Sequence, residues 1–156
     1  MPVEPLGYRV ATALATKVAE LTAAAVPDTV AKFYLRETVE YEPSVDGIPA
    51  IVVAKTPSTP IARRKLIHCR ELEYPFTVLL FSAVEASRKR GANWLDSWRD
   101  GLGDQLDGAK LSGVTEVVRI KVDDSVVLDL SQWESAKLFA IPLNLKIWCR
   151  IPTRTN

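Results

Sequence analysis

The strongest structural signal lies in residues 139–151, which read FAIPLNLKIWCRI. Apolar side chains occupy every second position, and most of the residues between them are polar or small. Because successive side chains of a β-strand point to opposite faces of a sheet, this alternation predicts a long strand with one buried face. Proline lacks a backbone N–H, so we expect Pro142 to lie where this strand has no paired neighbour or bulges. The predicted buried face comprises Phe139, Ile141, Leu143, Leu145, Ile147, Cys149 and Ile151, opposite Ala140, Pro142, Asn144, Lys146 and Arg150.

Other strand-like segments occur at residues 31–41, 50–54, 66–84 and 115–122. The first and the last alternate between apolar and polar residues, whereas the second is a short apolar run. The long third segment carries Pro75 near its middle, where the missing donor favours an edge, a break or, in our interpretation, a bend. Clean alternation is typical of antiparallel sheets, because the strands of a parallel sheet are buried on both faces.

Two segments have the periodicity of amphipathic helices, with apolar residues at spacings of three and four. The first covers residues 6–25, and the second begins after Asn93, which can cap a helix, and ends near Gly108. The order α-β-β-β-α-β-β predicts one α+β domain over residues 1–156, with an antiparallel or mixed sheet and two helices on one face. The apolar stripes are Val10, Leu14, Val18 and Leu21 in the first helix and Leu95, Trp98, Leu102 and Leu106 in the second.

The composition suits one compact domain, with 156 residues of which 47% are hydrophobic and 25% are charged. Twenty basic and 19 acidic side chains give a formal charge of +1, so no global charge favours nucleic acid or an anionic membrane as a partner. Arg9, Lys17 and Glu20 interrupt the first apolar segment, which therefore predicts neither a signal peptide nor a membrane span.

Reaction chemistry has little support in the sequence. No glycine-rich phosphate motif is present, and no CxxC or HExxH spacing accompanies His68, Cys69 and Cys149. Neighbouring strand residues point to opposite faces, so His68 and Cys69 would make a poor nucleophile pair. The sequence therefore predicts two buried free thiols, a structural histidine, no metal, no cofactor and no enzymatic activity.

Local charge clusters are the candidate functional features. Two basic clusters lie in predicted connections, and an acidic stripe lies on the second helix opposite its apolar side. Unlike patches on one subunit suit head-to-tail self-association, although a solvated surface is the simpler alternative and the basic clusters could also touch phosphates. Trp148 lies on the polar side of the last strand, where an uncovered aromatic residue would suit an interface. The clusters are Arg63, Arg64 and Lys65; Arg88, Lys89 and Arg90; and Asp96, Asp100, Asp104 and Asp107.

The order of elements over nearly the whole chain resembles the tail-terminator, or tail-completion, proteins of long-tailed bacteriophages. The resemblance rests on the opening helix and on four segments: Pro57-Ser58-Thr59-Pro60, Tyr74-Pro75-Phe76-Thr77-Val78-Leu79, Trp94-Leu95-Asp96-Ser97-Trp98 and Ile141-Pro142-Leu143-Asn144-Leu145-Lys146-Ile147. It carries no catalytic or interface residues over to this chain, so the charge clusters above remain our own inference.

The resemblance implies a non-enzymatic subunit of the virion tail or neck, assembled in the host cytoplasm. Its copies would form a hexameric ring at the head-proximal end of the tail tube, stop tube growth and join the head connector or stopper protein. The implied partners are its own copies, the tail tube protein and the connector, without a membrane or sequence-specific nucleic acid. Two alternatives stay open: another neck component, such as a connector or stopper, and a nucleic-acid or small-ligand binding module.

Overall fold

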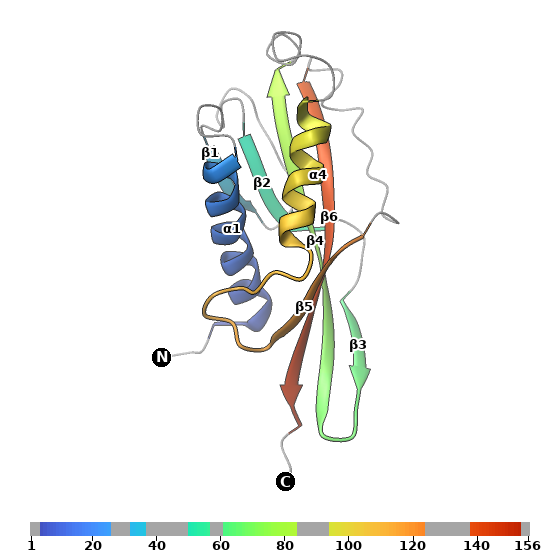
Figure 1. Ribbon diagram of the computed structural model, residues 1–156. Coiled ribbons are helices and arrows are strands. Elements are labelled where there is room, and N and C mark those ends of the chain that lie inside the picture. Colours follow the sequence, from blue (N-terminus) through green and yellow to red (C-terminus); the bar gives the residue numbers. More distant parts are fainter. Residues whose placement is uncertain are drawn as a thin grey trace.

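The computed structural model describes residues 4–25, 32–36, 50–56, 61–83, 94–123 and 138–153. Two helices pack on one face of a six-stranded sheet (Figure 1), which confirms the predicted α+β class. Along the sheet the strand order is β1-β2-β4-β6-β5, with β3 paired to β4. The β1–β2 pair is parallel and the other pairs are antiparallel. The elements are α1 (Leu6–Ala25), β1 (Lys32–Arg36), β2 (Ala50–Lys55), β3 (Ala62–Lys65), β4 (Cys69–Ala83), α4 (Trp94–Leu106), β5 (Val117–Val122) and β6 (Leu138–Pro152).

The core lies between the two helices and the facing side of the sheet. Both predicted helical stripes point into it as far as their side chains are described, and Leu21 is partly buried. Gly108 follows α4 with a φ of +73°, a conformation that glycine adopts without a steric cost, so the predicted end of this helix is confirmed. The best-buried core residues are Val10, Leu14 and Val18 of α1; Leu102 and Leu106 of α4; Val78 and Leu80 of β4; and Leu145, Ile147 and Cys149 of β6.

Strands β4 and β6 form the spine of the sheet. They pair without interruption from Cys69 opposite Pro152 to Ala83 opposite Leu138. On β6 the alternation predicted from the sequence is confirmed, because Leu143, Leu145 and Ile147 are all buried on the helix side.

Pro75 lies inside β4, which is one continuous strand, so the proline does not break the segment into two strands. The Pro75 carbonyl accepts a hydrogen bond from the Thr56 N–H at 3.1 Å. Because N–H and C=O of a strand residue point the same way, the donor that proline lacks would face the place where β4 changes its neighbour from β3 to β2. The sheet therefore tolerates a proline here at the junction of two shorter partners.

Pro142 occupies the corresponding position on β6. The Asn144 carbonyl accepts from the Asp123 N–H at 2.8 Å, so Asn144 and Pro142, two residues apart, both direct their backbone groups toward the β5 side. The described β5 pairing ends at Val122 opposite Leu145. Among the described strands, Pro142 thus lacks a partner on that side, as predicted.

Three local predictions were wrong. The chain has an additional strand, β3, so the described order is α-β-β-β-β-α-β-β. The sequence Ala62-Arg63-Arg64-Lys65 has no strand-like pattern, because this edge strand pairs through its backbone and all four of its side chains are exposed. The alternation of Val118, Ile120 and Val122 in the sequence predicts an inward face for all three, but Val118 is 48% exposed, because a register shift between Val117 and Arg119 turns it outward. His68 lies in the turn between β3 and β4, where it is exposed, and not within a strand.

The second face of the sheet is also covered in its middle, contrary to the simple polar face predicted for β6. Three polar residues are buried there: Thr56, directly after β2, Thr77 of β4 and Asn144 of β6. Their side chains form a chain of hydrogen bonds, with 2.9 Å between the Thr56 and Thr77 hydroxyls and 2.9 Å from the Thr77 hydroxyl to Asn144 Oδ1. Each of these three side chains thereby has a hydrogen-bond partner, which offsets the cost of burying a polar group.

Candidate functional site

A three-stranded arm extends beyond both helices (Figure 1). We define the arm as residues 62–73 and 148–152, that is β3, the first part of β4 and the end of β6. Its tip is the β3–β4 turn, closed by a hydrogen bond of 2.9 Å from the Leu66 N–H to the Cys69 carbonyl. The Ile67 side chain at this tip is 90% exposed. The arm thus presents an apolar residue at the end of a narrow sheet.

One face of the arm is basic. Residues directly opposite in an antiparallel pair lie on the same face, and the register places Lys65 opposite Arg70 and Arg63 opposite Leu72. These positions share the helix-side face of the sheet with Tyr74. Burial and then the Cys149 thiol raise the pKa of the Tyr74 hydroxyl, and Arg63 partly offsets this rise. Arg63, Lys65 and Arg70 form no ion pair with another described residue.

The opposite face of the arm has mixed charge. Arg64 lies opposite Glu71, which in turn lies opposite Arg150. Glu71 and Arg150 form an ion pair of 3.3 Å. The predicted cluster Arg63-Arg64-Lys65 is therefore divided by the strand, with two cations on one face and one on the other.

The acidic stripe of α4 borders a depression on the body of the molecule. Asp100, Asp104 and Asp107 are exposed at its rim, and Arg99 pairs with Asp100 at 2.9 Å. Asp104 and Asp107 form no ion pair within the described part of the chain. We call this depression the α4 groove; it is lined by Arg99, Asp100, Gly103, Asp104, Asp107, Val122 and Leu143.

Gly103 gives the α4 groove its apolar floor. A Cβ atom at this position would lie 3.3 Å from Leu143 Cδ1 and 3.5 Å from Val122 Cγ2, so the helix approaches the sheet closely there. Leu143 and Val122 consequently line the same depression as the aspartates. The groove combines an acidic rim with an apolar floor.

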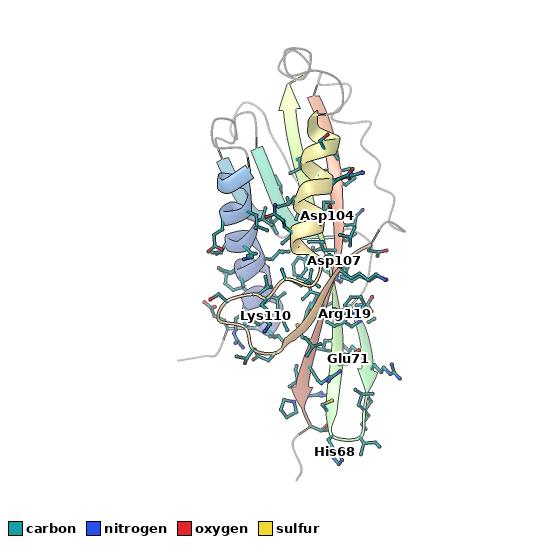
Figure 2. The ribbon with its side chains drawn as sticks, viewed as in Figure 1. His68, Glu71, Asp104, Asp107, Lys110 and Arg119 are labelled. Atoms are coloured by element: carbon teal, nitrogen blue, oxygen red, sulfur yellow. The ribbon has the colours of Figure 1, made fainter. Side chains whose placement is uncertain are left out.

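The arm tip and the α4 groove lie far apart on the same chain. Figure 2 shows Asp104 and Asp107 beside α4 and His68 at the turn of the β3–β4 hairpin, far from α4, with Glu71 between them. The structure therefore does not bring the tip of the arm and the described aspartates of α4 together within one subunit.

Trp148 is half-buried on the mixed face and is less available than the sequence suggested. The Arg119 guanidinium lies 4.3 Å from the centroid of its ring, a cation–π contact. Nearby, Lys146 lies 3.4 Å from Glu73 and 3.5 Å from Asp123. Burial opposes the charged form of Lys146, but the two carboxylates outweigh it and raise the pKa of the amine. The charged groups around Trp148 on this face of the sheet are therefore already engaged with other residues of the same chain.

An ion pair between distant segments was missed in the sequence. Arg9 of α1 donates to both carboxylate oxygens of Glu116, at 2.9 and 3.2 Å. These hydrogen bonds are the main reason why the pKa of Glu116 is lowered, and its own backbone adds to the effect. A contact between residues 107 positions apart leaves no local sequence signal, so only the fold reveals it.

Several chemical predictions can be compared with the structure. Both cysteines are free, but only Cys149 is fully buried and Cys69 is half-buried. Burial, helped by Glu116, raises the pKa of the Cys149 thiol to about 12. Among the described residues, no three histidine, cysteine, aspartate or glutamate side chains are grouped to hold a metal ion. Neither described helix is long and apolar enough to cross a membrane.

Four of the predicted interface residues cannot be placed. Arg88, Lys89 and Arg90 lie outside the described residues, and the Asp96 side chain lies outside them as well.

Comparison with protein-family models gives no match, and comparison with curated proteins gives none either. Among solved structures, this chain is similar to a chain from the virion of a native gene transfer agent particle, with a TM-score of 0.54 and 19% sequence identity. The similarity covers 94% of this chain and 99% of that chain. The two chains therefore share a fold from end to end.

Proposed function

We propose that this chain is a structural subunit of a phage-like virion and acts as its tail terminator. Copies of the chain form a ring, a hexamer in this proposal, at the head-proximal end of the tail tube. The ring stops tube growth and offers its outer surface to the head connector or stopper protein.

The observation that carries this proposal is the similarity to the chain of the gene transfer agent virion over nearly the full length of both chains. A feature of the molecule supports it. The arm and the α4 groove give one subunit two different surfaces of opposite charge, which suits a head-to-tail ring better than a two-fold dimer.

The position of the protein in the particle provides the direct test. Particles from the source of this sequence are labelled with gold-conjugated antibody against the chain and viewed by electron microscopy. Label at the junction of head and tail is expected. Label on the capsid shell or at the distal tail tip, or particles without label, would overturn the proposal.

Deletion of the gene separates a terminator from another neck component. Loss of a protein that stops tube growth should give tubes of excessive and variable length. Loss of a connector or stopper should instead give tails of normal length that are detached from heads. Restoring the intact gene in trans is the control, because it should return both tail length and joined particles.

A further inference from the structure

We propose that the arm of one copy docks in the α4 groove of a second copy. In this contact, which rests on the proposed ring function, Ile67 meets the apolar floor of the groove. The basic face of the arm then lies along its acidic rim.

The arm supplies one half of the contact. Its three cations Arg63, Lys65 and Arg70 lie on one face and form no ion pair with another described residue. Ile67 at the tip is 90% exposed, so its apolar surface is available to a partner. An arm that projects beyond both helices can enter a depression on a neighbouring molecule without displacing either helix (Figure 1).

The α4 groove supplies the other half. Asp104 and Asp107 are exposed without an ion pair among the described residues, and Val122 and Leu143 form the floor beside them. Opposite charges aligned across an interface direct encounter and set register, whereas apolar contact contributes affinity. The acidic rim of the groove is complementary to the basic face of the arm, and its apolar floor is complementary to Ile67.

The geometry requires two molecules. The arm tip points away from α4 of its own chain (Figure 2), so the two surfaces cannot meet within one subunit. A contact between two different surfaces is heterologous, and it leaves the pair of copies with a free arm at one end and a free groove at the other. Repetition of this contact closes a ring if the rotation permits.

Sedimentation of the purified full chain at low ionic strength tests the contact. Two exposed pairs, each contributing a few-fold, predict that reversal of the arm charges in R63E/K65E weakens self-association by about tenfold. Reversal of the groove in D104K/D107K should have a similar effect. The combination of both sets should restore association partly, because the signs are again complementary. Added salt should weaken association of the unmodified chain.

Arg64 provides a matched control. It lies on the same strand as Arg63 but on the opposite face, so R64E should leave association unchanged, whereas R63E, with the same change of charge, should weaken it. Equal effects of R63E and R64E would show that only the net charge of the chain matters for association, and this result would overturn the specific contact. A basic edge strand would then serve only to discourage pairing with other strands.

Carbodiimide cross-linking identifies the partners directly, because it joins an amine to a carboxylate in contact. A mixture of ¹⁵N-labelled and unlabelled copies should give mixed-isotope peptides that link Lys65 to Asp104 or Asp107. Links of Lys65 to other carboxylates, or a chain that stays monomeric at its highest concentration, would overturn the docking contact. The gold-labelling result does not depend on this contact. Label at the head-tail junction without association through the arm would therefore contradict the docking contact and leave the proposed function standing.

Discussion

Strands β4 and β6 pass through two regions that are stabilised in different ways. In the body, where helices cover the sheet, Phe76, Val78 and Leu80 of β4 are buried, as are Leu145 and Leu143 opposite the first two on β6. In the arm the same two strands continue beyond the helices (Figure 1), and of the arm's residues only Cys149 is buried in the core. The body therefore depends on apolar burial, which is the dominant favourable term in folding.

The arm depends on backbone pairing and a few charges. Arg150 and Glu71 pair across it, and the Thr153 N–H donates to the His68 carbonyl at 3.0 Å, which ties the end of β6 to the turn. Partly exposed ion pairs of this kind contribute little to stability. Substitutions of the exposed arm side chains should therefore cost the body little stability. These side chains are free to serve in recognition of a partner.

Truncation in the body should give the largest loss of stability. Leu145 is 1% exposed within the core, so Leu145→Ala should lower the free energy of unfolding by about 2–5 kcal/mol, through lost burial and the cavity that remains. Urea denaturation followed by tryptophan fluorescence measures this change.

Its neighbour Lys146 is the control. Lys146 lies on the other face and pairs with Glu73 and Asp123, so Lys146→Ala should cost only about 0–1 kcal/mol. Equal losses from the two replacements would show that the faces of β6 are not distinguished as described.

Removal of a buried hydroxyl should have the next largest effect. Thr77 is fully buried and donates to Asn144 Oδ1, so Thr77→Val should cost about 1–3 kcal/mol by leaving that acceptor without its donor. The same urea titration provides the measurement. The loss in the double variant Thr77→Val with Asn144→Leu should be smaller than the sum of the two single losses, because the hydrogen bond between these residues can be lost only once. Additive losses would contradict the hydrogen-bonded chain.

The alternation in residues 139–151 predicted the body well, because a strand covered on one side must place its apolar residues at every second position. The same rule failed for β3. Its residues Ala62-Arg63-Arg64-Lys65 bury no side chain, so no apolar pattern could identify a strand that forms through backbone pairing alone. The bulge that exposes Val118 also follows from pairing geometry and leaves no trace in the pattern.

The candidate surfaces were predictable only in part. Helical periodicity placed Asp100, Asp104 and Asp107 on an exposed face, because the opposite face of α4 carries Leu102 and Leu106. The division of the basic cluster between two faces required knowledge that Ala62–Lys65 is a strand. The apolar floor of the α4 groove combines residues from three elements and depends on Gly103, so it could not be found from local sequence.

The ion pair between α1 and the segment before β5 should give a smaller effect that depends on pH. The pKa of Glu116 in the folded chain lies below its ordinary value of 4.5, so the folded state favours the charged carboxylate more than the unfolded state does. The stabilisation is complete above the ordinary pKa and is lost as the pH falls through the lowered folded value. Glu116→Gln should therefore cost about 0–1 kcal/mol at neutral pH, and the difference from the unmodified chain should shrink in acid.

Thermal unfolding at several pH values between neutral and acid checks this prediction. Glu20→Gln is the control, because Glu20 lies on the exposed side of α1 and its nearest cation, Lys17, is 3.9 Å away. A difference between Glu116→Gln and the unmodified chain that stays constant with pH would contradict the assigned role of the carboxylate.

The smallest effect should come from the arm tip. Ile67 is 90% exposed and its turn is closed by a backbone hydrogen bond, so Ile67→Ala should change the free energy of unfolding by less than about 0.5 kcal/mol. The same replacement at Ile120, which is 1% exposed, should cost several times more and is the matched comparison. Both variants are measured by urea denaturation at two protein concentrations. Because a partner that binds only the folded state adds stability by mass action, docking of the arm predicts that the cost of Ile67→Ala grows with protein concentration, whereas the cost at Ile120 does not. A large cost at Ile67 in dilute solution would instead mean that the tip packs against its own chain, and the distinction between arm and body would fail.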